Sequence, residues 1–187
     1  DFSYLQEQDT TSWSNSRNSS SGLDKDGGLT LIYNRKFSKP GRTFTARINS
    51  SMSEGESNGY NYSLKNAQDS TTILDQRNFN SSENLSYGAR LSYVEPLGLS
   101  RKHFLETSLS FNGNQRNSVR NIFDLDAFGD YSSKNMDYSN EFDNSFYRET
   151  LELNYRYVNP NYNLTLGMTA EPSQTSSTTT YGNASSI

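Results

Sequence analysis

The chain contains no cysteine, a single histidine and only four prolines in 187 residues. Thiol catalysis, disulfides and cysteine zinc sites are therefore excluded, and a histidine-based triad would depend on His103 alone. No apolar run approaches the roughly 18 residues of a membrane-spanning helix, so the sequence predicts none. The net charge of −4 gives no support for binding to nucleic acid.

Hydrophobic residues are also scarce, at 31% of the chain, and Leu, Ile, Val and Phe together make about 19%, a level at which disorder becomes a serious alternative. The small net charge, the 13 tyrosines and the 10 phenylalanines are not typical of a disordered chain. The first residues lack the basic region and apolar core of a signal peptide. We expect the chain to be a slice of a longer protein.

Apolar and polar residues alternate over six segments, at 28–38, 44–52, 85–93, 105–111, 147–157 and 162–170. Successive side chains of a strand point to opposite faces, so this period indicates strands with one apolar and one polar face. The spacing of an amphipathic helix is not sustained anywhere. The sequence therefore predicts an all-β fold of antiparallel up-and-down hairpins, with residues 1–6 as a further strand.

Short and long links alternate along the chain. Three prolines stand in short links, where proline and glycine preset turn dihedrals: Lys39-Pro40-Gly41, Glu95-Pro96-Leu97-Gly98 and Asn159-Pro160-Asn161. The other links, 7–27, 54–82 and 115–143, are rich in Ser, Asn, Asp and Gly, and we expect long loops there, with strand continuing in parts such as 60–64 and 71–74. This organisation gives an antiparallel segment over 1–172 and a Ser/Thr-rich loop or linker over 173–187.

Two architectures use such strands: a soluble β-sandwich or barrel with the apolar face inward, and an outer-membrane barrel with that face in lipid. Strands of about 9–12 residues and short turns opposite long loops favour the membrane barrel. So does a polar face with charges of both signs, expected to face the lumen: Arg47, Arg90, Glu106, Arg148, Glu152 and Arg156. Aromatic residues beside the short turns predict a lipid-facing girdle of Phe37, Phe44, Tyr93, Tyr157 and Tyr162.

One hairpin carries a family resemblance. The stretch Leu85-Ser-Tyr-Gly-Ala-Arg-Leu-Ser-Tyr-Val-Glu-Pro-Leu-Gly, continued by Arg101-Lys-His-Phe-Leu-Glu106, resembles a hairpin of the outer-membrane β-barrel family of Bacteroidetes-type bacteria. These barrels are related to the barrel part of TonB-dependent receptors. The resemblance implies a non-catalytic protein of the bacterial outer membrane that takes part in nutrient or solute uptake, and it transfers no catalytic residue.

The expected strands are too few for a closed single-chain barrel, which needs an even number of at least about eight. We therefore expect the chain to be part of a larger barrel wall. Its expected partners are the bilayer with its lipopolysaccharide, the remaining strands or other outer-membrane proteins, and an unidentified solute. An ordered monomer in water without detergent would contradict a lipid-facing surface.

Candidate sites for chemistry are few. We expect His103 to be an interfacial turn residue rather than a general base, and Glu149 and Glu152 to be solvated rather than a glycosidase pair. No cofactor is expected, although Asp124, Asp126 and Asp130 offer oxygen ligands for calcium without the full twelve-residue loop pattern. Loop aromatic residues are candidates either for packing or for stacking on a ligand at the outer surface: Trp13, Tyr60, Tyr62, Phe123, Phe128 and Tyr131.

Two classes of function remain open, a transport barrel and a soluble cell-surface β-domain for binding or adhesion. The first requires amphiphile for a monodisperse fold, whereas the second does not.

We predict that Leu91→Arg destabilises the protein several times more than Ser92→Arg. A charge on the lipid face costs about 2–4 kcal/mol near the bilayer midplane, whereas a charge on the lumen face meets water. The measurement is the free energy of unfolding from a denaturant titration in lipid. Equal losses, or a larger loss for Ser92→Arg, would contradict the assignment of the two faces.

Overall fold

The structure is a computed structural model that describes residues 2–6, 9–67, 70–98, 100 and 102–180. Nine strands form one antiparallel sheet: β1 (Phe2–Gln6), β2 (Asp9–Lys36), β3 (Thr43–Ala67), β4 (Ser70–Leu97), β5 (His103–Asp124), β6 (Ser133–Lys134), β7 (Asn140–Asn159), β8 (Tyr162–Ala170) and β9 (Ser173–Thr179). The main path through the sheet is β1-β2-β3-β4-β5-β7-β8, with β6 paired to β5 and β9 to β7. The predicted all-β, up-and-down antiparallel fold is confirmed.

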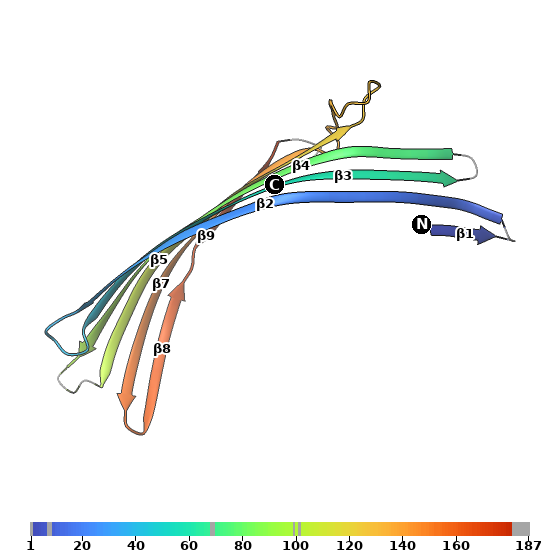
Figure 1. Cartoon of the computed structure of the whole chain (residues 1–187). Helices are drawn as coiled ribbons and strands as arrows, with labels where there is room; N and C mark the ends of the chain where they lie inside the picture. The colour runs from blue at the N-terminus through green and yellow to red at the C-terminus, as the bar shows by residue number, and fades with distance from the viewer. Residues whose placement is uncertain (1, 7–8, 68–69, 99, 101, 181–187) are drawn as a thin grey trace.

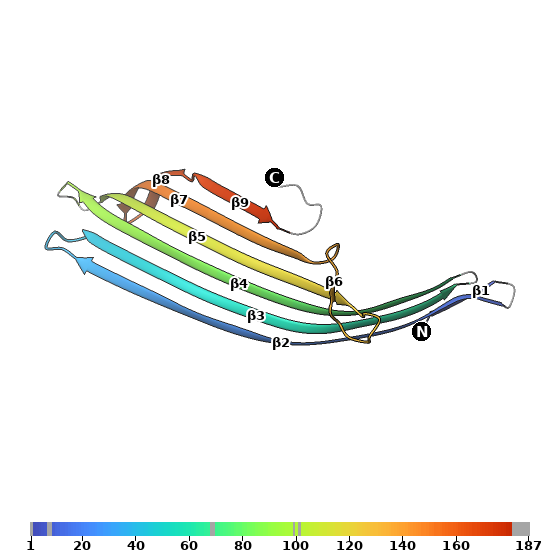
Figure 2. The same ribbon diagram turned by 90° about the horizontal axis from the view of Figure 1, so that it is seen from above.

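The long strands lie side by side in one curved sheet (Figures 1 and 2). The last residues of β2, β4 and β7 gather at one end of the sheet, which we call the turn end. The start of β2, the end of β3, the start of β4 and the segment between β5 and β7 lie toward the opposite end, called here the outer end. Over the described residues the sheet stays open, with β1 at one end of the strand order and β8 at the other. No second sheet covers it in that part of the chain, so a sandwich is not formed.

The register is continuous from β2 through β7, without a bulge. Because directly paired residues share a side of the sheet, the register assigns each strand residue to one of two faces. The apolar face carries the odd-numbered residues of β2, β4, β5 and β7 and the even-numbered residues of β3, β8 and β9. The polar face carries the others.

The prediction of long loops at 7–27, 54–82 and 115–143 is wrong for most of the length of these segments. β2 already begins at Asp9, and β3 and β4 continue to Ala67 and from Ser70, so that strand extends well beyond the expected parts 60–64 and 71–74. β5 runs to Asp124 and β7 begins at Asn140. These strand halves are mostly polar on both faces and show little alternation outside 60–64, and pairing with their neighbours holds them. Residues 7–8 and 68–69 lie outside the described residues.

The expected linker over 173–187 also needs correction, because Ser173–Thr179 is strand β9 and residues 181–187 lie outside the described residues. β8 and β9 pair with successive parts of β7. Between them, the amide of Glu149 donates to the carbonyl of Pro172 at 3.1 Å. The two strands therefore act as one edge strand interrupted at Glu171 and Pro172.

The predicted tight turns are present at the turn end. In the β2–β3 turn, Gly41 has a φ of 87°, and the Arg42 amide donates to the Lys39 carbonyl at 3.0 Å. Pro96 departs from the expectation, since it lies in β4 opposite Phe104 and the chain turns after it, at Gly98 with a φ of 71°. Only glycine adopts such positive φ values without strain.

A core in the usual sense is almost absent. Among the described residues, Ile122 is the only buried hydrophobic residue. Within the described part of the chain, no helix is long and apolar enough to cross a membrane. The stability of this single-layer sheet therefore depends on its backbone ladder and on what covers its apolar face.

Gly113 provides a local test of this packing, because the Tyr87 ring of the neighbouring strand lies over it. A Cβ at Gly113 would meet the ring at 2.6 Å, whereas a Cβ at Gly27, on the same face, would meet nothing within 4 Å. We expect Gly113→Ala to displace Tyr87 and lower the free energy of unfolding by about 1 kcal/mol, since the aromatic ring covers the glycine. Gly27→Ala, the matched control, is expected to stabilise by about 0.5 kcal/mol.

The measurement is denaturant unfolding of both variants in detergent micelles. Equal effects of the two substitutions would show that the Tyr87 ring does not stabilise Gly113.

Candidate functional site

The largest candidate site is a band of apolar side chains on the apolar face, near the turn end. It contains Leu29, Leu31 and Tyr33 of β2, alternate residues of β3 (44–52), β4 (85–93), β5 (105–111) and β7 (151–157), and those of β8 (162–170). We call this set the apolar band. Most of its members are exposed despite their chemistry, with 57% of Leu31, 53% of Leu109 and 61% of Leu166 accessible. An exposed apolar surface of this extent indicates contact with another apolar phase.

The apolar band follows the register of the sheet over β2, β3 and β4 and departs from it between β4 and β8. On β2 it is centred on Leu31, which lies in register with Ile48 and Ala89. On β8 it is centred on Leu166, which lies in register with Tyr155, Leu105 and then Glu95. Between β2 and β8 the centre of the band thus moves six residues along β4, from position 89 to position 95. The band is oblique to the strands.

The predicted girdle residues lie together at the turn end of the apolar band. Phe44, Tyr93, Tyr157 and Tyr162 are on the apolar face, and Phe37 follows β2 in the turn. The Phe37 and Tyr93 rings meet edge to face with centroids 6.3 Å apart, and the Tyr157 and Tyr162 rings are 5.7 Å apart.

A second aromatic cluster lies toward the outer end of the apolar band. The ring of Phe111 is 6.1 Å from that of Tyr87 and 6.3 Å from that of Tyr147. The phenol oxygen of Tyr147 accepts a hydrogen bond from Gln115 at 2.9 Å. The sequence analysis missed this cluster, because only the strand register shows that these three rings are neighbours. The apolar band therefore has aromatic residues near both of its margins.

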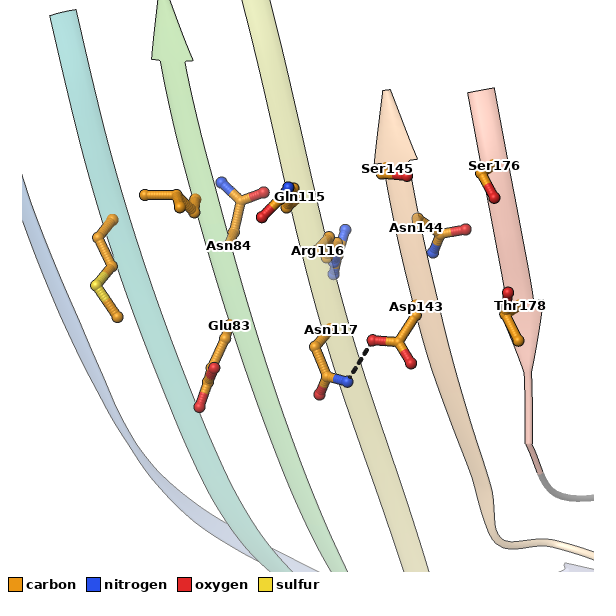
Figure 3. A pocket seen from close by; sticks show the side chains of 12 residues that line it. Glu83, Asn84, Gln115, Arg116, Asn117, Asp143, Asn144, Ser145, Ser176 and Thr178 are labelled. Atoms are coloured by element: carbon orange, nitrogen blue, oxygen red, sulfur yellow. Dashed lines mark hydrogen bonds between the residues drawn. The ribbon is translucent and has the colours of Figure 1, made fainter. Parts of the chain in front are cut away.

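Beyond this cluster the apolar face becomes polar. Lys25, Glu54, Glu83, Asn117 and Asp143 lie in one row across β2, β3, β4, β5 and β7. A shallow pocket of about 430 Å³ lies at this row. Figure 3 shows its lining, with Glu83 and Asn117 on adjacent strands and the Asn117 amide donating to Asp143 at 2.7 Å. The row directly follows the apolar band on β3 and β4, whereas several residues of the same face separate the two on β5 and β7.

The polar face carries all six residues predicted to face a lumen: Arg47, Arg90, Glu106, Arg148, Glu152 and Arg156. Arg90 reaches across β5 to Glu152 at 2.7 Å, and Ser108 donates to the same carboxylate at 2.8 Å. Arg156 pairs with Glu106 at 2.7 Å. The structure thus brings four of the six into two ion pairs, and these four lie on the face opposite the apolar band.

The turn end is tied together by Glu95, which lies beyond the apolar band of β4. Its carboxylate accepts hydrogen bonds from Lys39 at 2.6 Å, Arg42 at 2.7 Å and the Tyr93 hydroxyl at 2.8 Å. The Arg42 guanidinium and then the Lys39 ammonium and the Tyr93 hydroxyl hold the pKa of Glu95 at about 2, well below its usual value. The cluster clamps the β2–β3 turn against β4.

The candidate catalytic residues His103, Glu149 and Glu152 do not lie together in one site. Nδ1 of His103 lies 2.5 Å from the Tyr155 hydroxyl, and its ring packs on Tyr157 with centroids 4.9 Å apart. His103 is therefore part of the aromatic margin at the turn end. Glu149 and Glu152 lie on opposite faces of β7 and do not form a carboxylate pair.

The carboxylates Asp124, Asp126 and Asp130, considered above as possible oxygen ligands for calcium, are not gathered into one cluster among the described residues. Asp124 accepts hydrogen bonds from Gln76 at 2.7 Å and from Asn135 at 2.6 Å. Asp126 accepts hydrogen bonds from the backbone amides of residues 128 and 130, and from Ser132, and these bonds lower its pKa. Among the described residues, no group of three or more His, Cys, Asp or Glu side chains could hold a metal ion. The carboxylates instead shape the segment between β5 and β7.

Some of the aromatic residues predicted to contact a ligand pack against other rings, and the rest are described by their position or exposure. Tyr60 packs edge to face on Tyr131, with centroids 6.2 Å apart, and the Tyr131 hydroxyl donates to Asp75 at 2.6 Å. Phe123 likewise packs on Phe79, with centroids 5.7 Å apart. Trp13 and Tyr62 lie on β2 and β3 rather than in loops, while Phe128 is 93% exposed between β5 and β7. Of these residues, Phe128 is the most available to a partner.

Comparison with known proteins finds no family model that matches the chain and no curated protein with a significant match.

We predict that the Glu95 cluster makes stability dependent on pH in the acid range. Because the pKa of Glu95 is lowered in the folded protein to about 2 from 4.5, its contribution is complete above about pH 4.5 and is lost as the pH falls toward 2. The measurement is the free energy of unfolding of the wild type and Glu95→Gln between pH 6 and pH 2.

The difference between the two proteins is expected to shrink over this range. Glu83→Gln, at an exposed carboxyl of the same strand, is the control for the loss of one charge. A constant difference between wild type and Glu95→Gln would show that the turn-end ion pairs do not stabilise the sheet.

Proposed function

We propose that this sheet is part of the wall of an outer-membrane β-barrel that takes part in solute uptake. In this proposal, the apolar band contacts lipid and the polar face lines the lumen. The observation that carries it is the band itself: exposed, continuous over six strands, aromatic near both margins and bounded by a polar row. These are the features of a barrel's lipid-facing surface.

The obliqueness of the apolar band supports the same proposal quantitatively. Six residues along a strand correspond to about 20 Å, and the five strand spacings from β2 to β8 correspond to about 24 Å. If the band is parallel to the membrane plane, the strands are tilted by about 40° from the membrane normal, within the range of about 35–45° for membrane barrels. A surface evolved for a soluble partner has no reason to keep this slope.

The thickness of the apolar band agrees with a bilayer. On β4 the band covers Leu85 to Tyr93, and on β8 it covers Tyr162 to Ala170. Nine tilted residues are about the minimum for a transmembrane β-strand. The strands then continue far past the outer margin, and these extensions, polar on both faces, fit a wall that projects into water.

A soluble binding domain is the weaker candidate, because the apolar band would need a covering layer. The described residues form one sheet and supply no such layer. Solute uptake as the role of the barrel rests on the resemblance of the hairpin at 85–106 to TonB-dependent-receptor-like barrels. Within this proposal, the turn end faces the periplasm and the long outer end faces the cell exterior.

Ser50 and Ser51 allow a matched test, because they are adjacent on β3, chemically identical and both exposed, yet lie on opposite faces. Ser50 lies within the apolar band and Ser51 on the polar face. The chain has no cysteine, so Ser50→Cys and Ser51→Cys each give a single thiol. Both variants are labelled with a membrane-impermeant maleimide after reconstitution into lipid nanodiscs.

We expect Ser50→Cys to react at least about tenfold more slowly than Ser51→Cys in nanodiscs, because lipid excludes the reagent from the apolar face. In denaturant the two variants are expected to react equally, which serves as the control for intrinsic reactivity. Equal rates in nanodiscs would overturn the lipid-facing assignment.

A further inference from the structure

Charge is divided unequally between the two faces of the sheet. On β2 from Ser12 onward and on β3, β4, β5, β7, β8 and β9, the polar face carries eight Lys or Arg residues and five Asp or Glu residues, whereas the apolar face carries four and eight. The polar face is thus net positive in a chain whose net charge is −4. A random distribution of these charges would leave both faces nearly neutral.

Four arginines on the polar face have no carboxylate partner among the described residues: Arg47, Arg116, Arg120 and Arg148. Arg47 lies directly opposite Arg90, whose charge is balanced by Glu152. Arg148 packs over the Phe146 ring, 5.2 Å from its centroid, and carries no balancing anion. Two guanidinium groups are therefore uncompensated, Arg47 within the span of the apolar band and Arg148 just beyond its outer margin on β7.

The other two arginines continue this arrangement toward the outer end. Arg116 and Arg120 line a polar groove of about 470 Å³ together with Asp24, Asn80 and Asn140. Along β5, Arg120, Arg116 and the position paired with Arg148 are each four residues apart, a spacing of about 13 Å. The arginines thus form a series from the outer groove to the middle of the polar face.

We propose that this polar face selects anionic solutes, and that the four arginines bind their carboxylate or phosphate groups in succession. The inference rests on the proposed function, in which this face lines the lumen. A guanidinium presents a planar fork of donors that matches both groups, and it stays charged at any physiological pH. A cleft lined by charge of one sign raises the local concentration of ions of the opposite sign.

The test compares two small thiol reagents, an anionic sulfonatoethyl and a cationic trimethylammonioethyl methanethiosulfonate. The probe is Thr45→Cys, because Thr45 is two residues from Arg47 on the same face of β3. Rates are measured in detergent micelles, and the anionic-to-cationic ratio is divided by the same ratio for a small free thiol. We call the result the normalised ratio, and we expect it to be about ten at low salt and to fall toward one at high salt.

Ser81→Cys is the control on the opposite face, where Glu56 lies directly across and Glu83 two residues along the strand. There we expect the normalised ratio to fall below one. Adding Arg47→Gln to Thr45→Cys should lower the ratio severalfold, whereas Arg47→Lys, which keeps the charge, should preserve most of it.

A normalised ratio of one or less at Thr45→Cys would overturn the proposal, as would an unchanged ratio in Arg47→Gln. The salt dependence keeps the test decisive if Arg47→Gln does not fold, since a ratio at Thr45→Cys that does not fall at high salt also counts against a positively charged face. Because the rates are read in micelles, this result is independent of the nanodisc labelling. A failure of lipid exposure and a failure of anion preference are therefore separate outcomes.

Discussion

The ladder of backbone hydrogen bonds from β2 to β7 keeps its register over strands of 20 to 28 residues. Because the register does not slip, the number of a residue fixes the face on which it lies. One slipped position would place Arg47 and Arg90 among the leucines of the apolar band. The separation of the two faces, and with it each proposed role, depends on this continuity.

Such a sheet buries little of itself, and Ile122 is its only buried hydrophobic residue in the described part of the chain. The usual stabilising contribution of a hydrophobic core must therefore come from the surroundings. In the proposed function a bilayer supplies it for the apolar band and leaves the polar face, with its Arg90–Glu152 and Arg156–Glu106 pairs, in water. On that proposal, the low hydrophobic content of the sequence reflects a protein with its apolar surface outside.

Alternation in the sequence predicted the strands only where the two faces meet different surroundings. Around Leu91 and Ser92 the contrast is strong, and the strand, its face and the nearby turn could be predicted. At residues 9–27 and 54–82 both faces are mostly polar, so a period of two appears only in short parts such as 60–64 and the segments resemble loops, although neighbouring strands pair with most of their described residues. The Tyr87–Phe111–Tyr147 cluster and the Glu95 ion pairs required the register between strands, which a single sequence does not contain.

In the proposed function the apolar band lies parallel to a membrane, and the strands cross that membrane obliquely. The most direct measurement is the polarised infrared dichroism of the amide bands in oriented lipid multilayers containing the protein. We expect an average strand tilt of about 40° from the bilayer normal. Strands oriented in the plane of the bilayer, or without preferred orientation, would contradict it.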